Sequence, residues 1–332
     1  MEEILFKKDN NLMFSKFNNI ELKELFIELK NYYLTYRDNL NLPHNLTFGT
    51  ELEYDYMLKI LYDDFLSSNL PNWTSKTELS LLFGGEIVSP IMSDNNKTWT
   101  ELKLVCDYLN KNHAITKISA GGHIHIGANI LDNNIEAWKI FLKLYMCYEH
   151  ILFRFGYGDK INPRKSINIY STKCFEKLYD NLKYIEESKT LEDLHYTLDD
   201  KDNKYNALNF NNLRFNEYFN SRIHTIEFRF PNASSNEIIW QNNINTFSKM
   251  ILASLNNNID EEFLNYKIEE IYDNYSELKY NIIVLEDALE FVDLIFNNNL
   301  DKMYFLRQYF KNFEYSLERN YGFHPKSFTL KK

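Results

Sequence analysis

The chain has few cysteines. Cys106, Cys147 and Cys174 are the only ones in 332 residues, and no two of them form a C-x-x-C pair. An odd number with this spacing argues against a disulfide framework and suits buried or free thiols in a reducing compartment. The chain also lacks an apolar run of the roughly 18 residues that a membrane-spanning helix needs, and MEEILFKKDN lacks the pattern of a signal peptide. We therefore expect a cytoplasmic protein with no membrane partner.

Positive charge is scarce as well. The 37 Lys and Arg residues face 47 Asp and Glu residues, which gives a formal net charge of −10. This balance argues against a protein that mainly binds nucleic acid phosphates. The 44% hydrophobic content is enough for a sizeable core in one large domain or two, and no repeat or Pro/Ser-rich linker divides the chain.

Strands and helices are predicted in mixed order. Short neighbouring strands imply antiparallel pairing, so the pattern favours an α+β fold over a doubly wound sheet. We expect a helical C-terminal part from residue 235, and the 156–203 stretch shows no clear pattern. The predicted helices are 20–39, 57–68, 98–112 and 133–155, and the predicted strands are 46–56, 78–90, 114–118 paired with 122–129, 204–210 and 224–230.

The strand LTFGTELEYDY, residues 46–56, carries two acids on one face. Side chains alternate along a strand, so Glu51 and Glu53 point one way while Leu52 and Tyr54 point the other. Two neighbouring like charges repel each other. A solvated outer face is the ordinary explanation, and a bound cation between the acids is the alternative.

Three other segments show a similar arrangement. His123 and His125 share one face of GGHIHIGANI, and Glu227 and Arg229 share one face of HTIEFRF. Glu86 follows two glycines in FGGEIVSP, where glycine permits a bulge or a close backbone approach. Taken singly, each has a plain structural explanation: satisfied histidines, an exposed ion pair and a glutamate at a turn.

Taken together, the segments favour a shared cleft on one sheet. Four carboxylates gathered there would repel strongly unless cations neutralised them. Oxygen-rich ligation with one or two histidines suits magnesium or manganese better than zinc, and magnesium in turn suggests phosphates. An arginine facing the cleft could neutralise charge during phosphoryl transfer. Because the sequence has neither a P-loop nor the protein-kinase motifs, this sheet would have to hold the nucleotide itself.

The segments FGTELEYD, GGEIVSP, SAGGHIHIGAN, KYNALNF and HTIEFRFPNAS, in this order, resemble the amidoligase family, relatives of glutamine synthetase and glutamate cysteine ligase. The resemblance spans roughly residues 46–250. It implies an α+β, glutamine synthetase-like fold: a curved antiparallel sheet with helices on its convex side, whose concave face binds ATP and two or three divalent cations, Mg²⁺ or Mn²⁺. It also implies ligation of a carboxylate to an amine through an acyl phosphate.

The resemblance also assigns roles to residues. Glu51, Glu53, Glu86, His123 and Glu227 match the metal-binding positions. His125 and Arg229 match positions near the transferring phosphate and, with Glu86, form the predicted catalytic set. Tyr205 and Asn209 in KYNALNF match a segment that lines the nucleotide or substrate site. Two departures, TELS at 77–80 and Lys204, concern recognition of the substrate carboxylate.

Residues 1–258 are expected to form the catalytic domain, beginning with the helix at about 20–39, and residues 259–332 a helical extension. Substrates would be small-molecule or peptide carboxylates and amines, with protein side chains also open. Three other functions compete with ligation: a guanidino phosphotransferase that also uses ATP, a metal-dependent hydrolase that uses the His pair, and a catalytically silent scaffold.

Overall fold

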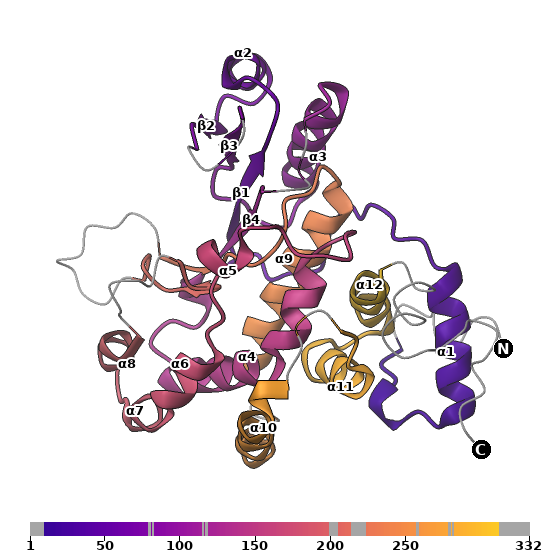
Figure 1. The fold of residues 1–332 in the computed structure, drawn as a ribbon, viewed down its shortest axis with the longest axis vertical. Helices are drawn as coiled ribbons and strands as arrows, with labels where there is room; N and C mark the ends of the chain where they lie inside the picture. Colours follow the sequence, from indigo (N-terminus) through magenta and orange to yellow (C-terminus); the bar gives the residue numbers. More distant parts are fainter. Residues whose placement is uncertain are drawn as a thin grey trace.

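The computed structural model describes residues 10–311 except for 79–80, 82, 115, 117–118, 199–204, 214–223, 257–258, 278–279 and 281. Its centre is a six-stranded, open antiparallel sheet with strand order β2-β3-β1-β4-β6-β5 (Figure 1). The strands are β1 (Phe48–Tyr54), β2 (Thr74–Lys76), β3 (Gly85–Val88), β4 (Gly122–Gly127), β5 (Leu208–Asn209) and β6 (Thr225–Phe228). The predicted α+β class is confirmed.

Twelve α-helices lie in the described part of the chain. They are α1 (Asn19–Asn31), α2 (Lys59–Asn69), α3 (Asn96–Lys111), α4 (Ile135–Gly156), α5 (Ile167–Tyr170), α6 (Phe175–Asp180), α7 (Leu182–Glu187), α8 (Leu191–Leu198), α9 (Glu237–Ser254), α10 (Glu261–Asp273), α11 (Leu285–Ile295) and α12 (Asn299–Phe310). None of the described helices is long and apolar enough to cross a bilayer.

One face of the sheet packs against helices α3, α4 and α9. Leu52 and Ile124 on this face are fully buried. The ring of Phe228 stacks on Phe247 of α9 with centroids 4.3 Å apart, and Phe48 stacks on Trp99 of α3 at 5.2 Å. Because side chains alternate along each strand, this packing turns the other set of side chains to the opposite face.

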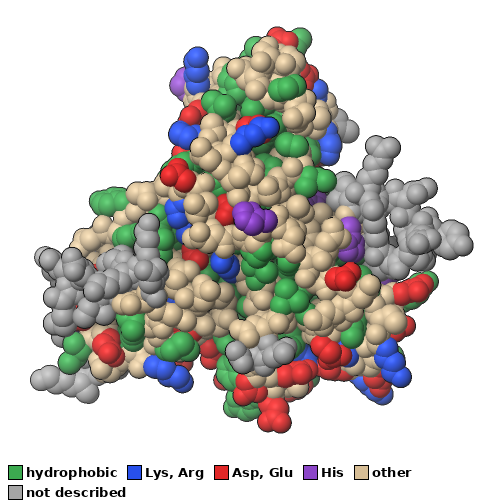
Figure 2. Space-filling view, turned by 180° about the vertical axis from the view of Figure 1, so that it is seen from behind, with side chains coloured by type: hydrophobic (Ala, Val, Ile, Leu, Met, Phe, Trp, Pro, Cys, Tyr) green, Lys and Arg blue, Asp and Glu red, His purple; other side chains and the backbone are tan. Residues whose placement is uncertain are grey.

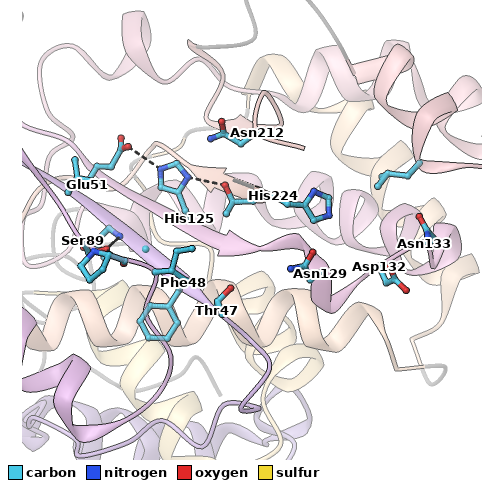
Figure 3. Close-up of a pocket in the computed structure, with 17 residues that line it drawn as sticks. Thr47, Phe48, Glu51, Ser89, His125, Asn129, Asp132, Asn133, Asn212 and His224 are labelled. Atoms are coloured by element: carbon cyan, nitrogen blue, oxygen red, sulfur yellow. Dashed lines mark hydrogen bonds and ion pairs between the residues drawn. The ribbon is translucent and has the colours of Figure 1, made fainter. Parts of the chain in front are cut away.

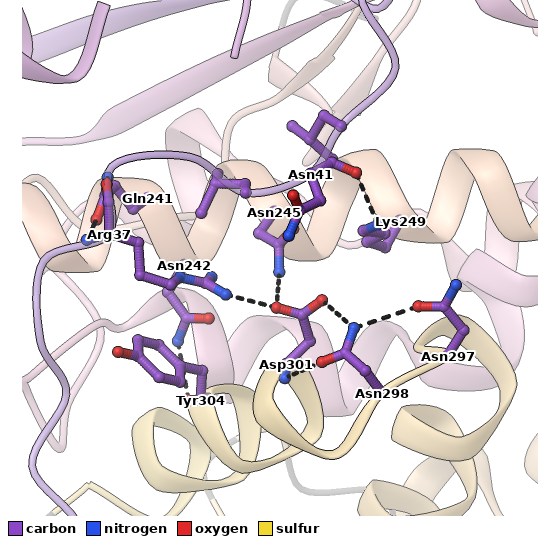
Figure 4. Close-up of polar contacts among 12 residues, drawn as sticks. Arg37, Asn41, Gln241, Asn242, Asn245, Lys249, Asn297, Asn298, Asp301 and Tyr304 are labelled. Atoms are coloured by element: carbon purple, nitrogen blue, oxygen red, sulfur yellow. Dashed lines mark hydrogen bonds and ion pairs between the residues drawn. The ribbon is translucent and has the colours of Figure 1, made fainter. Parts of the chain in front are cut away.

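The C-terminal helices pack on α4 and α9 and share one hydrophobic core with the sheet. Between α9 and α12 lies a polar interface (Figure 4) in which Asp301 accepts hydrogen bonds from Arg37, Asn245 and Asn298. The Arg37 guanidinium also lies 4.3 Å from the centre of the Tyr304 ring. The division of the chain at residue 258 stays a prediction.

The predicted 20–39 helix is too long, since α1 ends at Asn31. The next residues run beside α12, and side chains of that helix form hydrogen bonds with their backbone. Arg307 donates to the Tyr32 carbonyl at 2.9 Å, and the Thr35 amide donates to the Tyr304 hydroxyl at 3.2 Å. These bonds replace the helical ones that residues 32–39 would otherwise make.

The segment before α1 is held by α11 and α12. Asp293 of α11 accepts hydrogen bonds from the Phe14 amide, at 3.0 Å, and the Ser15 amide, at 2.7 Å. Lys302 of α12, which is fully buried, donates to the Leu12 carbonyl and pairs with Asp293, both at 2.8 Å or less. Helices α1, α11 and α12 therefore lie together on one side of the molecule (Figure 1).

Two predicted strands differ from the structure. Among the described residues of the predicted 78–90 strand, only Gly85–Val88 form a strand, β3. Just before it, Gly84 passes so close to β1 that a Cβ there would lie 1.7 Å from the Tyr54 carbonyl oxygen. The predicted pairing of 114–118 with 122–129 is wrong: β4 pairs with β1 on one side and β6 on the other, so both its edges are taken. Residues 115 and 117–118 lie outside the described part.

The irregular 156–203 stretch contains four short helices, α5 to α8. Seen from behind, the molecule carries most of its visible acidic side chains along the lower edge, over the region of α7 and α10 (Figure 2). All three cysteines are buried free thiols, as the sequence predicts.

Candidate active site

The sheet face opposite the helices presents a row of ionisable side chains. Strand alternation in β1 gives a burial pattern in which Phe48, Thr50, Leu52 and Tyr54 are buried while Glu51 and Glu53 are partly exposed. The register then aligns the acids with their neighbours: Glu51 lies opposite His123, and Glu53 lies opposite Glu86. On the other side of β4, His125 lies opposite Glu227 of β6.

Glu51 is the centre of this row. Its Oε2 lies 3.1 Å from Nδ1 of His123, and its Oε1 lies 3.4 Å from Nε2 of His125. His125 is oriented by Thr225 of β6, whose hydroxyl lies 3.2 Å from Nδ1 (Figure 3). Two histidines on one strand thus hold the two oxygens of one carboxylate.

Glu227 joins the same group from β6. Its Oε1 lies 3.6 Å from Nδ1 of His123 and 3.9 Å from Nε2 of His125, and it accepts a short hydrogen bond from Arg229. Glu51, His125 and Glu227 each offer one ligand atom, and these atoms all lie within 4.8 Å of one another. That spacing would let the three side chains bind one cation.

Glu53 and Glu86 extend the row toward the other end of the sheet. Glu53 lies 3.7 Å from Nε2 of His123 and accepts a short hydrogen bond from the Gly121 amide. Glu86, in the middle of β3, is paired with Lys76 of the edge strand β2, with Lys76 Nζ 3.3 Å from Glu86 Oε1.

Burial and neighbouring charges set the protonation of the row. Burial alone would raise the pKa of Glu51, but hydrogen bonds from His123 and His125 outweigh it and hold that pKa well below its usual range. Burial and the charge of Glu51 raise the pKa of Glu86. Burial would lower the pKa of His125, but its hydrogen bond to Glu51 and the charge of Glu227 raise it overall. The acids at the centre therefore depend on neighbouring positive charge.

The structure brings together Glu51, Glu53, His123, His125, Glu227 and Arg229, and Lys76 links Glu86 to them. Asn209 pairs with Glu227 across β5 and β6, but its side chain accepts a hydrogen bond from the Asn211 amide at 2.8 Å and so caps the turn. Tyr205 packs its ring on Tyr170, with centroids 5.8 Å apart. Lys204 and residues 79–80 lie outside the described part. The roles of all these residues stay predictions.

Sequence reasoning missed two cations, Lys76 and Arg164. Lys76 belongs to a strand of only three residues, too short for a visible alternation, although its place just before the Glu86 strand could have indicated a hairpin. Arg164 is buried, and its guanidinium donates to the Pro231 and Arg229 carbonyls at 2.5 and 2.8 Å. Burial lowers the Arg164 pKa to about 10, partly offset by the charge of Glu53. No local pattern in the sequence points to such a contact.

A cavity of about 600 Å³ opens beside the His125 end of the row (Figure 3). Gly49, which lies opposite His125 in the register, is one of the lining residues, and a Cβ there would make only ordinary contacts. Apart from Glu51, His125, His224 and Asp132, the described lining is uncharged. It comprises the polar residues Thr47, Thr50, Ser89, Asn129, Asn133, Asn212 and Thr225 and the apolar or small residues Phe48, Gly49, Val88, Pro90, Ile91 and Leu191.

The donor set fits a hard divalent cation. Four carboxylates and two imidazoles converge, whereas all three cysteines are buried as free thiols and none is part of the row. Carboxylate oxygens with a minority of imidazole nitrogens are typical of magnesium and manganese sites. Glu51, His125 and Glu227 would hold one ion, with Glu53, Glu86 and His123 available to a neighbouring one.

A family model described as "putative amidoligase enzyme" matches residues 33–251, about two thirds of the chain. The chain belongs to this amidoligase family. The match covers every strand of the sheet and every residue of the row, and it begins earlier than the 46–250 resemblance, within the extended segment after α1. The comparison with curated proteins gave no match. Amidoligases join carboxyl and amino groups, so the family makes this chain a ligase.

Proposed function

We propose that this amidoligase is an ATP- and Mg²⁺-dependent carboxylate–amine ligase that works through an acyl phosphate. The observation that carries the proposal is the convergence of Glu51, His125 and Glu227 within 4.8 Å, on a sheet face that adjoins a ligand-sized cavity. Magnesium or manganese bound at this row would neutralise the charge of the phosphates. We also propose that the open antiparallel sheet, with α3, α4 and α9 packed on one face, is the glutamine synthetase-like curved sheet.

The cavity supports a nucleoside next to the row. Its volume lies within the range of about 300–1,000 Å³ common for small-molecule sites. Hydroxyl and amide side chains with apolar neighbours such as Ile91 and Leu191 suit an uncharged sugar and base. The phosphates of ATP would then extend from the cavity toward His125 and Arg229.

The chemistry follows from the weakness of a free carboxylate as an electrophile. In the first step, a carboxylate oxygen of the substrate would attack the terminal phosphorus of ATP, and the bond to ADP would break. In the second, the amine nitrogen would attack the acyl carbon, and phosphate would leave with the bonding electron pair. The neutral amine gives up one proton to a nearby base as the amide forms.

Arg229 and His125 would act on the charge that develops in these steps. The guanidinium of Arg229 is mostly buried and already directed at Glu227, so it needs little reorganisation. His125 is fixed by Thr225 on one nitrogen and faces Glu51 with the other. Both groups are thus held in place before a substrate binds.

The substrates we propose are a small-molecule or peptide carboxylate and an amine, or a protein side chain in place of either one. ATP supply and three free thiols suit the cytoplasm. A guanidino phosphotransferase would consume ATP without forming an amide, and a hydrolase using His123 and His125 would need no ATP.

Hydroxylamine trapping tests the proposal. The protein would be incubated with ATP, Mg²⁺, hydroxylamine and a pool of acids, beginning with glutamate, and a hydroxamate formed together with ADP would be detected by mass spectrometry. Glu51→Gln should abolish the product, whereas Glu136→Gln, on the exposed side of α4, should not. Metal-dependent hydrolysis of amides or esters, with no ADP formed from any acid, would favour the hydrolase instead.

A further inference from the structure

Lys76 brings a positive charge into the acidic row from the sheet edge. In the register it lies directly opposite Glu86, and its ammonium is 3.3 Å from Glu86 Oε1 and 3.9 Å from Glu51 Oε1. One ammonium is therefore shared by acids of two strands, β3 and β1. The same Glu51 oxygen lies 3.4 Å from Nε2 of His125, so it also faces the His125 and Glu227 side of the row.

The two partners differ in their surroundings. The side chains of Glu86 and Glu51 are only 10% and 20% exposed, while that of Lys76 is 57% exposed. The acids are fixed in interior strands of the sheet, but Lys76 belongs to a three-residue edge strand and has a long, flexible stem. The ammonium can leave the acids for water at little cost, whereas the acids cannot follow it.

We propose that Lys76 is an exchangeable cation of the active site. It neutralises Glu86 and Glu51 in the metal-free protein, gives way when a divalent cation binds the row, and then contacts the anionic group of a substrate. The inference rests on the proposed function because it uses the same metal site, but it concerns a residue outside the metal-binding and catalytic set.

Electrostatics supports both halves of this exchange. A divalent cation bound at these oxygens would repel an ammonium only a few ångströms away, and this repulsion is strong where water is partly excluded. The displaced side chain stays tethered at β2, beside the row. Carboxylate and phosphate groups brought to the metal would then be the nearest negative charges to it.

Calorimetric titration with Mn²⁺ tests whether a divalent cation displaces Lys76. Lys76→Met keeps the length of the side chain but removes the competing charge, so it should bind Mn²⁺ at least tenfold more tightly than wild type. Lys76→Arg should stay close to wild type. Lys183→Met is the matched control, because Lys183 is 80% exposed and pairs with Glu187 within α7 at 3.9 Å, and it should change nothing.

Pyrophosphate, titrated into protein saturated with Mn²⁺, tests whether the displaced Lys76 contacts an anionic group. Here Lys76→Met should bind severalfold more weakly than wild type, while Lys76→Arg and Lys183→Met should bind as well as wild type. The expected signature of Lys76→Met is thus tighter metal binding together with weaker anion binding. Circular dichroism and the melting temperature would show that each variant is folded.

Three outcomes would overturn the inference. Unchanged Mn²⁺ and pyrophosphate binding in folded Lys76→Met would make the lysine an ordinary surface partner of Glu86. Weaker Mn²⁺ binding in Lys76→Met would mean that the lysine holds the acids in place for the metal and does not compete with it. Failure of wild type to bind Mn²⁺ at all would remove the metal site, and with it both this inference and the proposed function, whereas the first two outcomes leave the proposed function standing.

Discussion

The sheet row and the interface between α9 and α12 are both buried clusters of polar side chains, but they are organised differently. In the interface, Asp301 is held by Arg37 at 2.6 Å, by two asparagine amides, and by its place in the first turn of a helix capped by Asn298. The backbone of Arg37 is held in turn by the Gln241 side chain, which accepts a hydrogen bond from the Arg37 amide and donates one to the Arg37 carbonyl. The charge there is matched by groups that cannot easily leave.

In the row, Glu51 and Glu86 meet partners that are exchangeable. The partners of Glu51 are imidazoles, which bind protons reversibly, and a lysine that reaches in from solvent. A buried acid that is permanently paired supports the fold, while buried acids held by replaceable partners are prepared for a ligand. On these grounds alone, without reference to the family, we propose that the row serves a ligand while the interface holds α12 to α9.

The largest expected effect is on metal binding. Glu51→Gln keeps the side-chain volume but removes the central negative ligand, so the dissociation constant for Mn²⁺ should rise at least a hundredfold. The melting temperature of the metal-free protein should stay within a few degrees of wild type. Calorimetry with an EDTA-treated sample measures the first, and a thermal scan the second. Normal Mn²⁺ affinity in this variant would place the cation elsewhere.

Arg229→Ala should have the next largest effect, which is on turnover. The loss of one preorganised charged group typically lowers turnover by roughly a hundredfold to a thousandfold, and the assay is hydroxamate formation. Its backbone amide, which donates to the Ala207 carbonyl at 2.8 Å, is unaffected, so the fold should persist. A clear drop in melting temperature with normal turnover would make Arg229 a structural partner of Glu227.

Asp301→Ala should show the opposite pattern. It leaves Arg37 without its carboxylate partner in the interface, and breaking a buried pair from one side costs about 3–5 kcal/mol of unfolding free energy. Urea unfolding measures this loss. Mn²⁺ affinity of the folded protein should not change, and a large change in it would mean that the two clusters are coupled.

The smallest effect concerns Glu149 of α4, another buried acid. It accepts hydrogen bonds from Tyr280 at 2.6 Å, from Tyr145 at 3.1 Å and from backbone amides at the start of α6. Burial raises its pKa above the ordinary value despite these donors. Its contribution to stability is therefore fully present below the unfolded pKa and is lost as pH rises through the folded one.

Glu149→Gln should remove this dependence. The unfolding free energy lost in the variant, relative to wild type, should be larger near pH 5 than near pH 8. Urea unfolding at the two values measures it, with Glu136→Gln as an exposed acid on the same helix for comparison. An equal loss at both pH values would mean that Glu149 has the same charge in the folded and unfolded protein.

The sequence predicts the acidic row well because strand alternation is local. Placing Glu51 and Glu53 on one face of their strand, and His123 and His125 on one face of theirs, needs only the period of two, and antiparallel pairing then brings the strands into register. The α+β class follows from the same local patterns.

What could not be predicted depends on contacts between distant segments. The end of α1 at Asn31 is set by bonds from α12, and the strand at 122–129, predicted to pair with 114–118, pairs instead with β1 and β6. Lys76 and Arg164 enter the site only through the folded chain, since one lies in a three-residue strand and the other in an irregular loop.

The contact between Asp293 and the N-terminal segment has a consequence for synthesis on the ribosome. The Phe14 amide and its Asp293 acceptor are 279 positions apart, so the segment before α1 can dock only after α11 has been made. The strands that carry the acidic row are all made by residue 228, well before α11. The nascent chain can thus pair the strands of the acidic row before α11 and α12 exist, and the segment before α1 joins them late.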